Sequence, residues 1–214
     1  MSLVLLCGLL AAAAGLTNWW AIIVGRKPVE RAAKPLTMVA LGALALSLGA
    51  GDTSTGRWLL LALVLCLIGD VALLGESTGH FLAGLTAFLL GHLAYVACFV
   101  ALGLRGGWPW ALIGLGVVAI SLAFGRRILP TVARTEGATL AAAVAAYMLV
   151  IAAMAATGWA TGRALIGLGV SSFVVSDTVL AINKFVAPLR RGQLLVMVTY
   201  HLAQVLIVLG VLLH

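Results

Sequence analysis

The sequence predicts an all-α polytopic membrane protein: a bundle of eight transmembrane helices forming a single domain over residues 1–214. Of the 214 residues, 64% are hydrophobic and only 9% are charged, which is more apolar side chain than a soluble domain of this size can bury. The apolar residues gather in stretches close to the length of about 17–25 residues that a helix needs to cross a bilayer. Short connections with Gly, Pro and charged residues separate them, and none is long enough for a soluble domain.

The first four spans are expected at residues 2–24, 35–50, 58–75 and 81–103. The first is interpreted as a retained helix and not as a cleaved signal peptide, because the basic residues Arg26 and Lys27 follow its apolar run instead of preceding it. The second, which is the shortest, begins at Pro35, since proline is well tolerated in the first turn of a helix. Polar connections around Asp52 and Glu76 separate the second, third and fourth spans.

The last four spans are expected at residues 109–125, 138–157, 162–182 and 192–213. The segment from Arg126 to Pro130 is expected to end the fifth, because it combines two charged side chains with a proline. Asn183 and Lys184 mark the end of the seventh.

The basic residues fall mainly in alternate connections. Ten of the 13 Lys and Arg residues flank the first, fifth and seventh connections: Arg26, Lys27, Arg31, Lys34, Arg126, Arg127, Arg134, Lys184, Arg190 and Arg191. The positive-inside rule places these connections in the cytoplasm and both termini outside it. We expect the chain in a bacterial inner (plasma) membrane, where its net charge of +7 also suits contact with anionic lipids. No motif indicates nucleic-acid binding.

Two carboxyl groups interrupt the apolar stretches. Of the six acidic residues, four are expected in polar connections, whereas Asp70 and Asp177 lie inside the third and seventh spans. A charged side chain at the bilayer centre costs roughly 2.5–3.5 kcal/mol on insertion scales, so it usually faces a bundle interior or wet cavity and marks a functional site. The alternative is a structural polar contact between helices.

Most other intramembrane polar side chains are expected at mid-depth or in the cytoplasmic half of the bilayer. The third and seventh spans run in the same direction, so Asp70 and Asp177 should lie at similar depth. We expect one polar cavity that opens toward the cytoplasm and binds a substrate. The binding residues expected there are Asn18, Lys34, Thr37, His92, Tyr95, Ser176, Lys184, Tyr200, His201 and Gln204. For the tyrosines and the serine, a hydrogen bond within or between helices is the alternative.

Several short motifs occur in order along the chain: Lys34-Pro35-Leu36-Thr37, Gly69-Asp70, Gly84-x-x-x-Phe88-x-x-Gly91-His92-x-x-Tyr95, Ser176-Asp177 followed by Asn183-Lys184-Phe185, and Tyr200-x-x-x-Gln204. Together they resemble the YhhN family of polytopic membrane proteins, which includes the lysoplasmalogenases. The resemblance implies an eight-helix enzyme that hydrolyses the vinyl ether bond of lysoplasmenyl-ethanolamine or -choline. Its products would be a fatty aldehyde and glycerophosphoethanolamine or -choline. Family members commonly carry a second tyrosine where this chain has His201.

The two aspartates also suit this chemistry. A vinyl ether is cleaved when its alkene carbon is protonated, which gives an oxocarbenium ion that water attacks. Asp70 and Asp177 could divide the work, one as the protonated acid and the other as the ionised group that stabilises the cation, as paired carboxyls do in glycosidases. Lys34 and Lys184 could bind the phosphate of the lysophospholipid substrate. No cofactor or metal is required, and the sequence does not indicate an oligomeric state.

Two other functions stay open. The first is a metal-dependent lipid hydrolase that uses His92, His201, Asp70 and Asp177, since catalytic zinc takes three protein ligands and a water. Against it, no His-x-x-x-His pair occurs on any span. The second is a proton-coupled transporter, in which buried aspartates relay protons.

Overall fold

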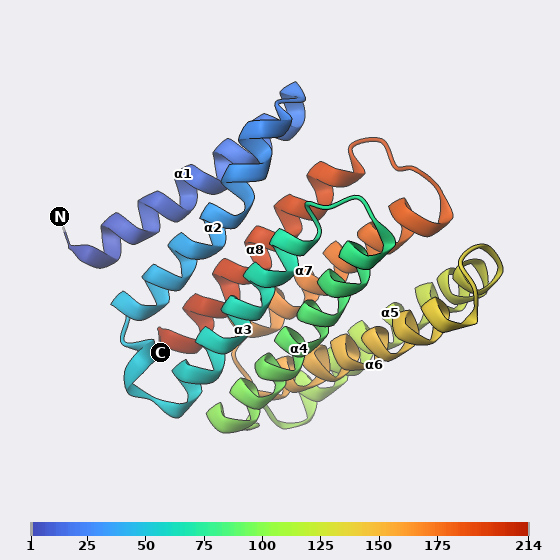
Figure 1. Ribbon diagram of the computed structural model, residues 1–214. Coiled ribbons are helices and arrows are strands. Elements are labelled where there is room, and N and C mark those ends of the chain that lie inside the picture. The colour runs from blue at the N-terminus through green and yellow to red at the C-terminus, as the bar shows by residue number, and fades with distance from the viewer. Residues whose placement is uncertain (1, 214) are drawn as a thin grey trace. The chain divides into compact units, whose positions relative to one another are not determined.

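The structure, a computed structural model, describes residues 2–213, and its regular elements in that range are all helical. This confirms the predicted all-α class. The elements shown in Figure 1 are α1 (Leu3–Val24), α2 (Lys27–Ser47), η1 (Ala50–Asp52), α3 (Ser54–Ala72), α4 (Thr78–Leu102), α5 (Gly107–Thr135), α6 (Ala138–Ala160), α7 (Ala164–Ala181), η2 (Ile182–Val186) and α8 (Gly192–Leu212).

The helices fall into two compact units. The first contains α1 to α4 and the last turn of α8, from Val208 onward, and the second runs from Gly103 to Ile207. The predicted single domain over residues 1–214 stays a prediction, and Met1 and His214 lie outside the described residues.

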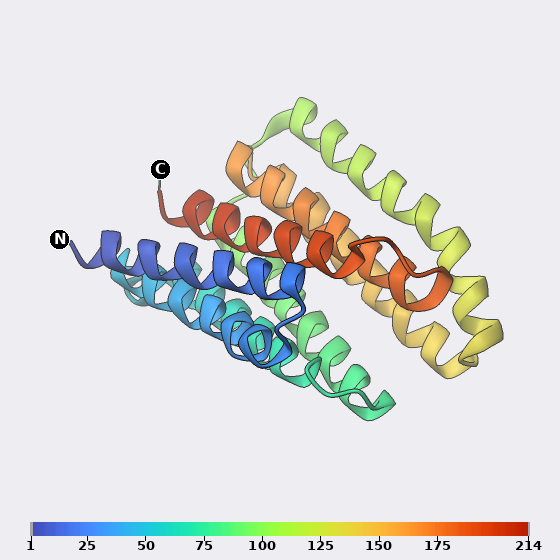
Figure 2. The ribbon, with the colours of Figure 1, turned by 90° about the horizontal axis from the view of Figure 1, so that it is seen from above.

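The first unit consists of two helical hairpins. Figures 1 and 2 show α1 antiparallel to α2 and α3 antiparallel to α4. Local signals set the helix ends: the Ser2 hydroxyl accepts a hydrogen bond from the amide of Leu5 at the start of α1, and Gly25 ends that helix with a φ of 73°. Thr53 caps α3 in the same way, by accepting from the amide of Gly56. Such caps satisfy backbone groups that a helix end leaves unpaired.

The second helix begins earlier than its apolar stretch predicts. It starts at Lys27, with Pro28 in its first turn, so Pro35 lies inside the helix and not at its start. The prediction that Pro35 begins a span is therefore wrong. Proline is pre-organised for a first turn, and Pro28 supplies that signal seven residues upstream. Glu30, expected in a connection, is consequently part of α2 and is buried.

In the second unit, α5 antiparallel to α6 forms the first hairpin (Figures 1 and 2). α5 runs to Thr135 and contains Arg126, Arg127 and Pro130, so the expectation that this segment is a connection is wrong. Arginine is a good helix former, and a change from apolar to basic side chains marks where a helix leaves the apolar layer, not where it ends. After Ala181, α7 passes into a π turn over Ile182–Val186.

Seven helices in residues 2–213 are long and apolar enough to cross a membrane, and α2 is the helix not among them. Large apolar side chains are exposed along them, for example Leu112 and Leu115 on α5 and Leu149 on α6. Soluble monomers rarely expose contiguous apolar surfaces of this extent. The chain is an integral multi-pass membrane protein; an eighth crossing by α2 and the predicted orientation of the termini stay predictions.

Candidate functional site

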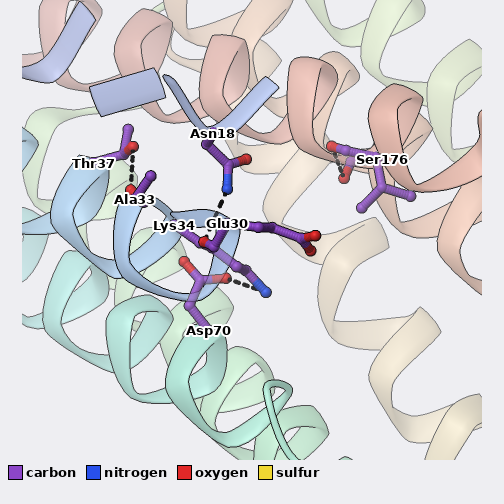
Figure 3. Close-up of polar contacts among 8 residues, drawn as sticks. Asn18, Glu30, Ala33, Lys34, Thr37, Asp70 and Ser176 are labelled. Carbon is purple, nitrogen blue, oxygen red and sulfur yellow. Dashed lines mark hydrogen bonds and ion pairs between the residues drawn. The ribbon is translucent and has the colours of Figure 1, made fainter. Parts of the chain in front are cut away.

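A buried ion pair joins Lys34 on α2 to Asp70 on α3. The Lys34 Nζ lies 3.2 Å from Oδ1 of Asp70, and the two side chains are 12% and 1% exposed. Figure 3 shows the ammonium group reaching across from α2 to the carboxylate. Lys34, which was predicted to bind a substrate phosphate, is therefore held beside a predicted catalytic carboxylate.

The glycines of the sequence motifs explain how α3 and α4 hold Asp70 in place. A Cβ on Gly69 would lie 2.6 Å from the ring of Phe88, and a Cβ on Gly84 would lie 2.6 Å from the Leu73 side chain. A Cβ at either position would force the neighbouring side chain or helix to shift, so the glycines allow the two helices to pack closely. Asp70 follows Gly69 directly, which fixes its carboxylate on this tightly packed helix.

A second polar contact joins α1 to α2. The fully buried Asn18 donates from Nδ2 to the backbone carbonyl of Glu30 at 3.3 Å, as Figure 3 shows. The Glu30 carboxylate lies 3.4 Å from the ammonium of Lys27. Asn18 was predicted as a site residue, whereas Glu30 was not. Glu30 could have been found in the sequence from its spacing of four residues from Lys34, which places the two side chains on one face of a helix.

The other predicted residues of the first unit are buried, and each contacts a neighbour on its own helix. The Thr37 hydroxyl donates to the carbonyl of Ala33 on its own helix at 2.9 Å, an arrangement common for threonine in helices. Nδ1 of His92 lies 2.6 Å from the carbonyl of Phe88. Tyr95 is fully buried and stacks on Phe99, with ring centroids 6.0 Å apart. Their predicted role in substrate binding stays a prediction.

In the second unit, Asp177 on α7 is hydrogen-bonded to a residue that the sequence analysis missed. The hydroxyl of Tyr147 on α6 donates to Oδ2 of Asp177 at 2.5 Å. Tyr147 is buried and Asp177 is partly buried. The chain has three tyrosines, and all lie inside apolar helices. Tyr147 could have been found from this placement, because a buried tyrosine hydroxyl usually has a hydrogen-bond partner.

Two serines attach α7 to α8. The Ser176 hydroxyl donates to the carbonyl of Val196 at 3.0 Å, and the Ser172 hydroxyl donates to the carbonyl of Thr199 at 2.8 Å. The dashed line at Ser176 in Figure 3 marks the first of these contacts. The hydroxyls thus bond a neighbouring helix. This fixes the position of Asp177, the residue that follows Ser176.

The predicted residues of α8 form one buried polar row. The Tyr200 ring packs edge-on against Phe173 with centroids 5.4 Å apart and contacts the ring of His201 at 5.6 Å. His201 is almost fully buried and Gln204 is fully buried. Polar side chains buried in a membrane protein usually serve as contacts between helices or as parts of a functional site.

Lys184 lies where the helical period changes. An α-helix through both residues would place Lys184 on the same face as Asp177, seven residues earlier, but Lys184 belongs to the π turn η2. Its side chain is exposed, and its Nζ lies 5.8 Å from the centroid of the Phe185 ring. The shared face is therefore not supported, because a π turn does not keep the period of 3.6 residues.

The predicted residues divide between the units. Asn18, Lys34, Thr37, Asp70, His92 and Tyr95 belong to the first, and Ser176, Asp177, Lys184, Tyr200, His201 and Gln204 belong to the second. That they line one cavity stays a prediction. Within residues 2–213, no group of three or more His, Cys, Asp and Glu side chains could hold a metal ion, so the metal-dependent alternative rests on the sequence alone.

Comparison with known proteins gives one family match. The model of the YhhN family matches residues 29–211, which include every predicted site residue except Asn18. No solved structure matches the chain.

Curated relatives are similar over about 70% of the chain. "Lysoplasmalogenase TMEM86B" of Sus scrofa is 37% identical over 152 residues, which are 70% of this chain and 61% of the relative. The protein of the same name from Homo sapiens is 35% identical over 71% of this chain and 62% of its own length. "Lysoplasmalogenase TMEM86A" of Homo sapiens is 30% identical over 69% and 62%. The match thus spans about three fifths of these relatives.

Proposed function

The chain belongs to the YhhN family, and we propose that it is a lysoplasmalogenase, an intramembrane hydrolase that cleaves the vinyl ether bond of lysoplasmalogens. The proposed substrates are lysoplasmenyl-ethanolamine and lysoplasmenyl-choline. The products are a fatty aldehyde and glycerophosphoethanolamine or glycerophosphocholine. The observation that supports this most strongly is the identity of 30–37% to relatives named lysoplasmalogenase.

The reaction is an acid-catalysed hydration. A proton adds to the alkene carbon remote from the ether oxygen, which produces an oxocarbenium ion. The oxygen of water then bonds to the cationic carbon and loses a proton, and the resulting hemiacetal opens to an aldehyde and an alcohol. The protein must supply a proton donor, a group that stabilises positive charge, and an environment in which one water is correctly placed.

We propose that Asp70 and Asp177 both take part in this acid catalysis. Both are carboxyl groups on apolar helices, where an ionisable side chain is costly and usually marks a functional site. Asp70 contacts the ammonium of Lys34 and Asp177 contacts the hydroxyl of Tyr147. Each carboxyl is therefore oriented by a partner on a neighbouring helix, as catalytic groups require.

The remaining predicted residues are proposed to bind the lysophospholipid. An ammonium group has three donors, so Lys34 can contact a phosphate oxygen while it stays beside Asp70. Lys184 is exposed and is a further candidate for the phosphate. The proposed contacts with the glycerol, the attacking water and the chain come from Asn18, Thr37, His92, Tyr95, Ser176, Tyr200, His201 and Gln204.

The decisive measurement is the release of aldehyde from lysoplasmenyl-ethanolamine by the purified full chain in detergent, with and without a chelator. Aldehyde release that the chelator does not change is the expected result. Loss of activity with chelator would replace the proposal by the metal-dependent hydrolase. A lysophospholipid with a saturated ether is the matched control substrate, because it has no alkene carbon to protonate. Folded protein that releases no aldehyde would overturn the proposal and leave the proton-coupled transporter, to be tested by flux into vesicles.

A further inference from the structure

Side-chain hydrogen bonds join α6 to α7 at Trp159–Ser171 and at Tyr147–Asp177. They differ in the group that accepts the hydrogen bond. The indole Nε1 of Trp159 donates to Oγ of Ser171 at 3.0 Å, and Ser171 also donates to the carbonyl of Gly167 at 2.9 Å. The hydroxyl of Tyr147 donates to Oδ2 of Asp177 at 2.5 Å. The first contact joins a neutral donor to a neutral hydroxyl, whereas the second ends on a carboxyl group.

The backbone around Asp177 is already fixed without this contact. Ser172 and Ser176 donate to backbone carbonyls of α8, and a Cβ on Gly169 would lie 2.8 Å from the Ile207 side chain. These interactions hold α7 against α8 over two turns. Removing the Tyr147 hydroxyl should therefore leave the helix in place and take one hydrogen bond from the Asp177 carboxyl. This separates orientation of the carboxyl from support of the fold.

We propose that Tyr147 is a positioning residue for Asp177, and that Asp177 is the group that protonates the vinyl ether. The inference rests on the proposed lysoplasmalogenase function. Asp70 contacts the ammonium of Lys34, whereas Asp177 contacts the neutral hydroxyl of Tyr147. A carboxyl that gives up a proton must first carry one, and a hydroxyl can donate to Oδ2 of a protonated carboxyl as well as to a carboxylate. With Oδ2 accepting from Tyr147, the transferable proton is on Oδ1.

The chemical step balances with these groups alone and one water. The O–H bond of the Asp177 carboxyl breaks as a C–H bond forms at the alkene carbon remote from the ether oxygen, which leaves an aspartate carboxylate and an oxocarbenium ion. The Tyr147 hydroxyl keeps donating to Oδ2 and stabilises the carboxylate as it forms. Water adds to the cation and returns a proton to the carboxylate, and the hemiacetal then opens to the aldehyde and the glycerol hydroxyl.

The test compares Tyr147→Phe with Ser171→Ala, which removes the hydrogen bond between Trp159 on α6 and Ser171 on α7. If Tyr147 orients the acid, Tyr147→Phe lowers kcat about tenfold or more and changes KM little, because misplacing a catalytic group by about 1 Å can cost up to a hundredfold. Ser171→Ala keeps the wild-type kcat. Equal kcat losses in the two variants, or a wild-type kcat in Tyr147→Phe, would overturn the inference.

A double-mutant cycle with Asp177→Glu tests whether Tyr147 acts through the carboxyl. Asp177→Glu keeps an acid but moves it by one methylene group, so it should lower kcat by itself. Adding Tyr147→Phe to that variant should then cost little more, since contacting groups give non-additive effects. Fully additive losses would assign Tyr147 a separate structural role. Absence of aldehyde release by the wild type would instead show that the proposed function is wrong, and the inference would fail with it.

Discussion

Lys34 and Asp70 form an ion pair across the α2–α3 contact, with 3.2 Å between Nζ and Oδ1 and with the aspartate almost completely removed from solvent. A buried pair of this kind is not by itself a source of stability, because both charges lose their hydration. Breaking it from one side is costly, since the remaining charge stays buried without its counter-ion. The ion pair therefore gives a prediction about the stability of the protein that can be tested without measuring enzymatic activity.

Replacing Lys34 by methionine should destabilise the chain by about 3–5 kcal/mol, the range found when one partner of a buried pair is removed. The double variant Lys34→Met/Asp70→Asn should recover most of this loss, because the uncompensated carboxylate is gone. Unfolding of the purified protein in detergent, followed by circular dichroism, measures both. Wild-type stability in Lys34→Met would show that the pair is hydrated and not buried.

Arg31 provides the matched control on the same helix. Its Nη2 lies 3.8 Å from Oε1 of Glu76, and the two side chains are 58% and 94% exposed. Exposed pairs contribute about 0–1 kcal/mol, so Arg31→Met should unfold almost like the wild type. Lys34 and Arg31 together separate the effect of burial from the effect of losing a positive charge.

Gly69→Ala should disturb the packing of α3 on α4. The added Cβ would lie 2.6 Å from the Phe88 ring, so the ring or the helix has to move, and overpacking of this kind typically costs about 1–3 kcal/mol. Because Asp70 is the next residue, the displacement should also lower aldehyde release. Thermal unfolding and the hydrolysis assay measure the two effects.

Gly42→Ala is the control for the glycine substitution. Gly42 is also inside a helix, but a Cβ there would have no neighbour within 4 Å. Alanine is favoured over glycine in a helix by roughly 0.5–1 kcal/mol, so this variant should be as stable as the wild type or slightly more stable. Equal destabilisation at both positions would contradict the close packing at Gly69.

The eight predicted spans correspond in order to the eight α-helices of residues 2–213. Seven of these helices are long and apolar enough to cross a bilayer, which is the signal that the sequence carries, and α2 is not among them. The sequence predicts the ends of the helices less well, because the change from apolar to polar side chains marks the edge of the apolar layer. α2 begins at Lys27 and α5 continues to Thr135, and in both cases the extra turns contain Lys or Arg. These residues are good helix formers that also suit the headgroup region.

The residues of the candidate site were likewise predicted only in part. Asp70 and Asp177 are visible in the sequence, because a carboxyl inside an apolar stretch is unusual. Their partners are not visible, because the contacts of Lys34 and Tyr147 depend on which helix packs against which. Lys34 was expected to bind the phosphate and Tyr147 was not selected, whereas the structure places each beside an aspartate.

Asp70→Asn and Asp177→Asn should each abolish aldehyde release from protein that still folds, although Asp70→Asn should also be less stable because Lys34 loses its counter-ion. Asparagine has almost the same shape as aspartate but cannot donate a carboxyl proton or provide a negative charge, so the loss should be in kcat. Asp52→Asn is the matched control, because Asp52 is exposed in η1, and it should keep full activity. Wild-type turnover in either buried variant would remove that aspartate from the mechanism.

Lys184→Gln tests whether the π turn takes part in binding the substrate phosphate. Lys184 is exposed on η2 and its Nζ lies 5.8 Å from the Phe185 ring centroid, so the fold should not depend on it. A contact that is equally strong in the ground state and the transition state affects KM and not kcat. A loss of about 1.4 kcal/mol would raise KM about tenfold.

Arg190→Gln is the matched control. It removes one positive charge from the connection that follows η2, and its KM should stay near that of the wild type. Similar KM values in the two variants would show that Lys184 contributes only to the general positive charge of this connection.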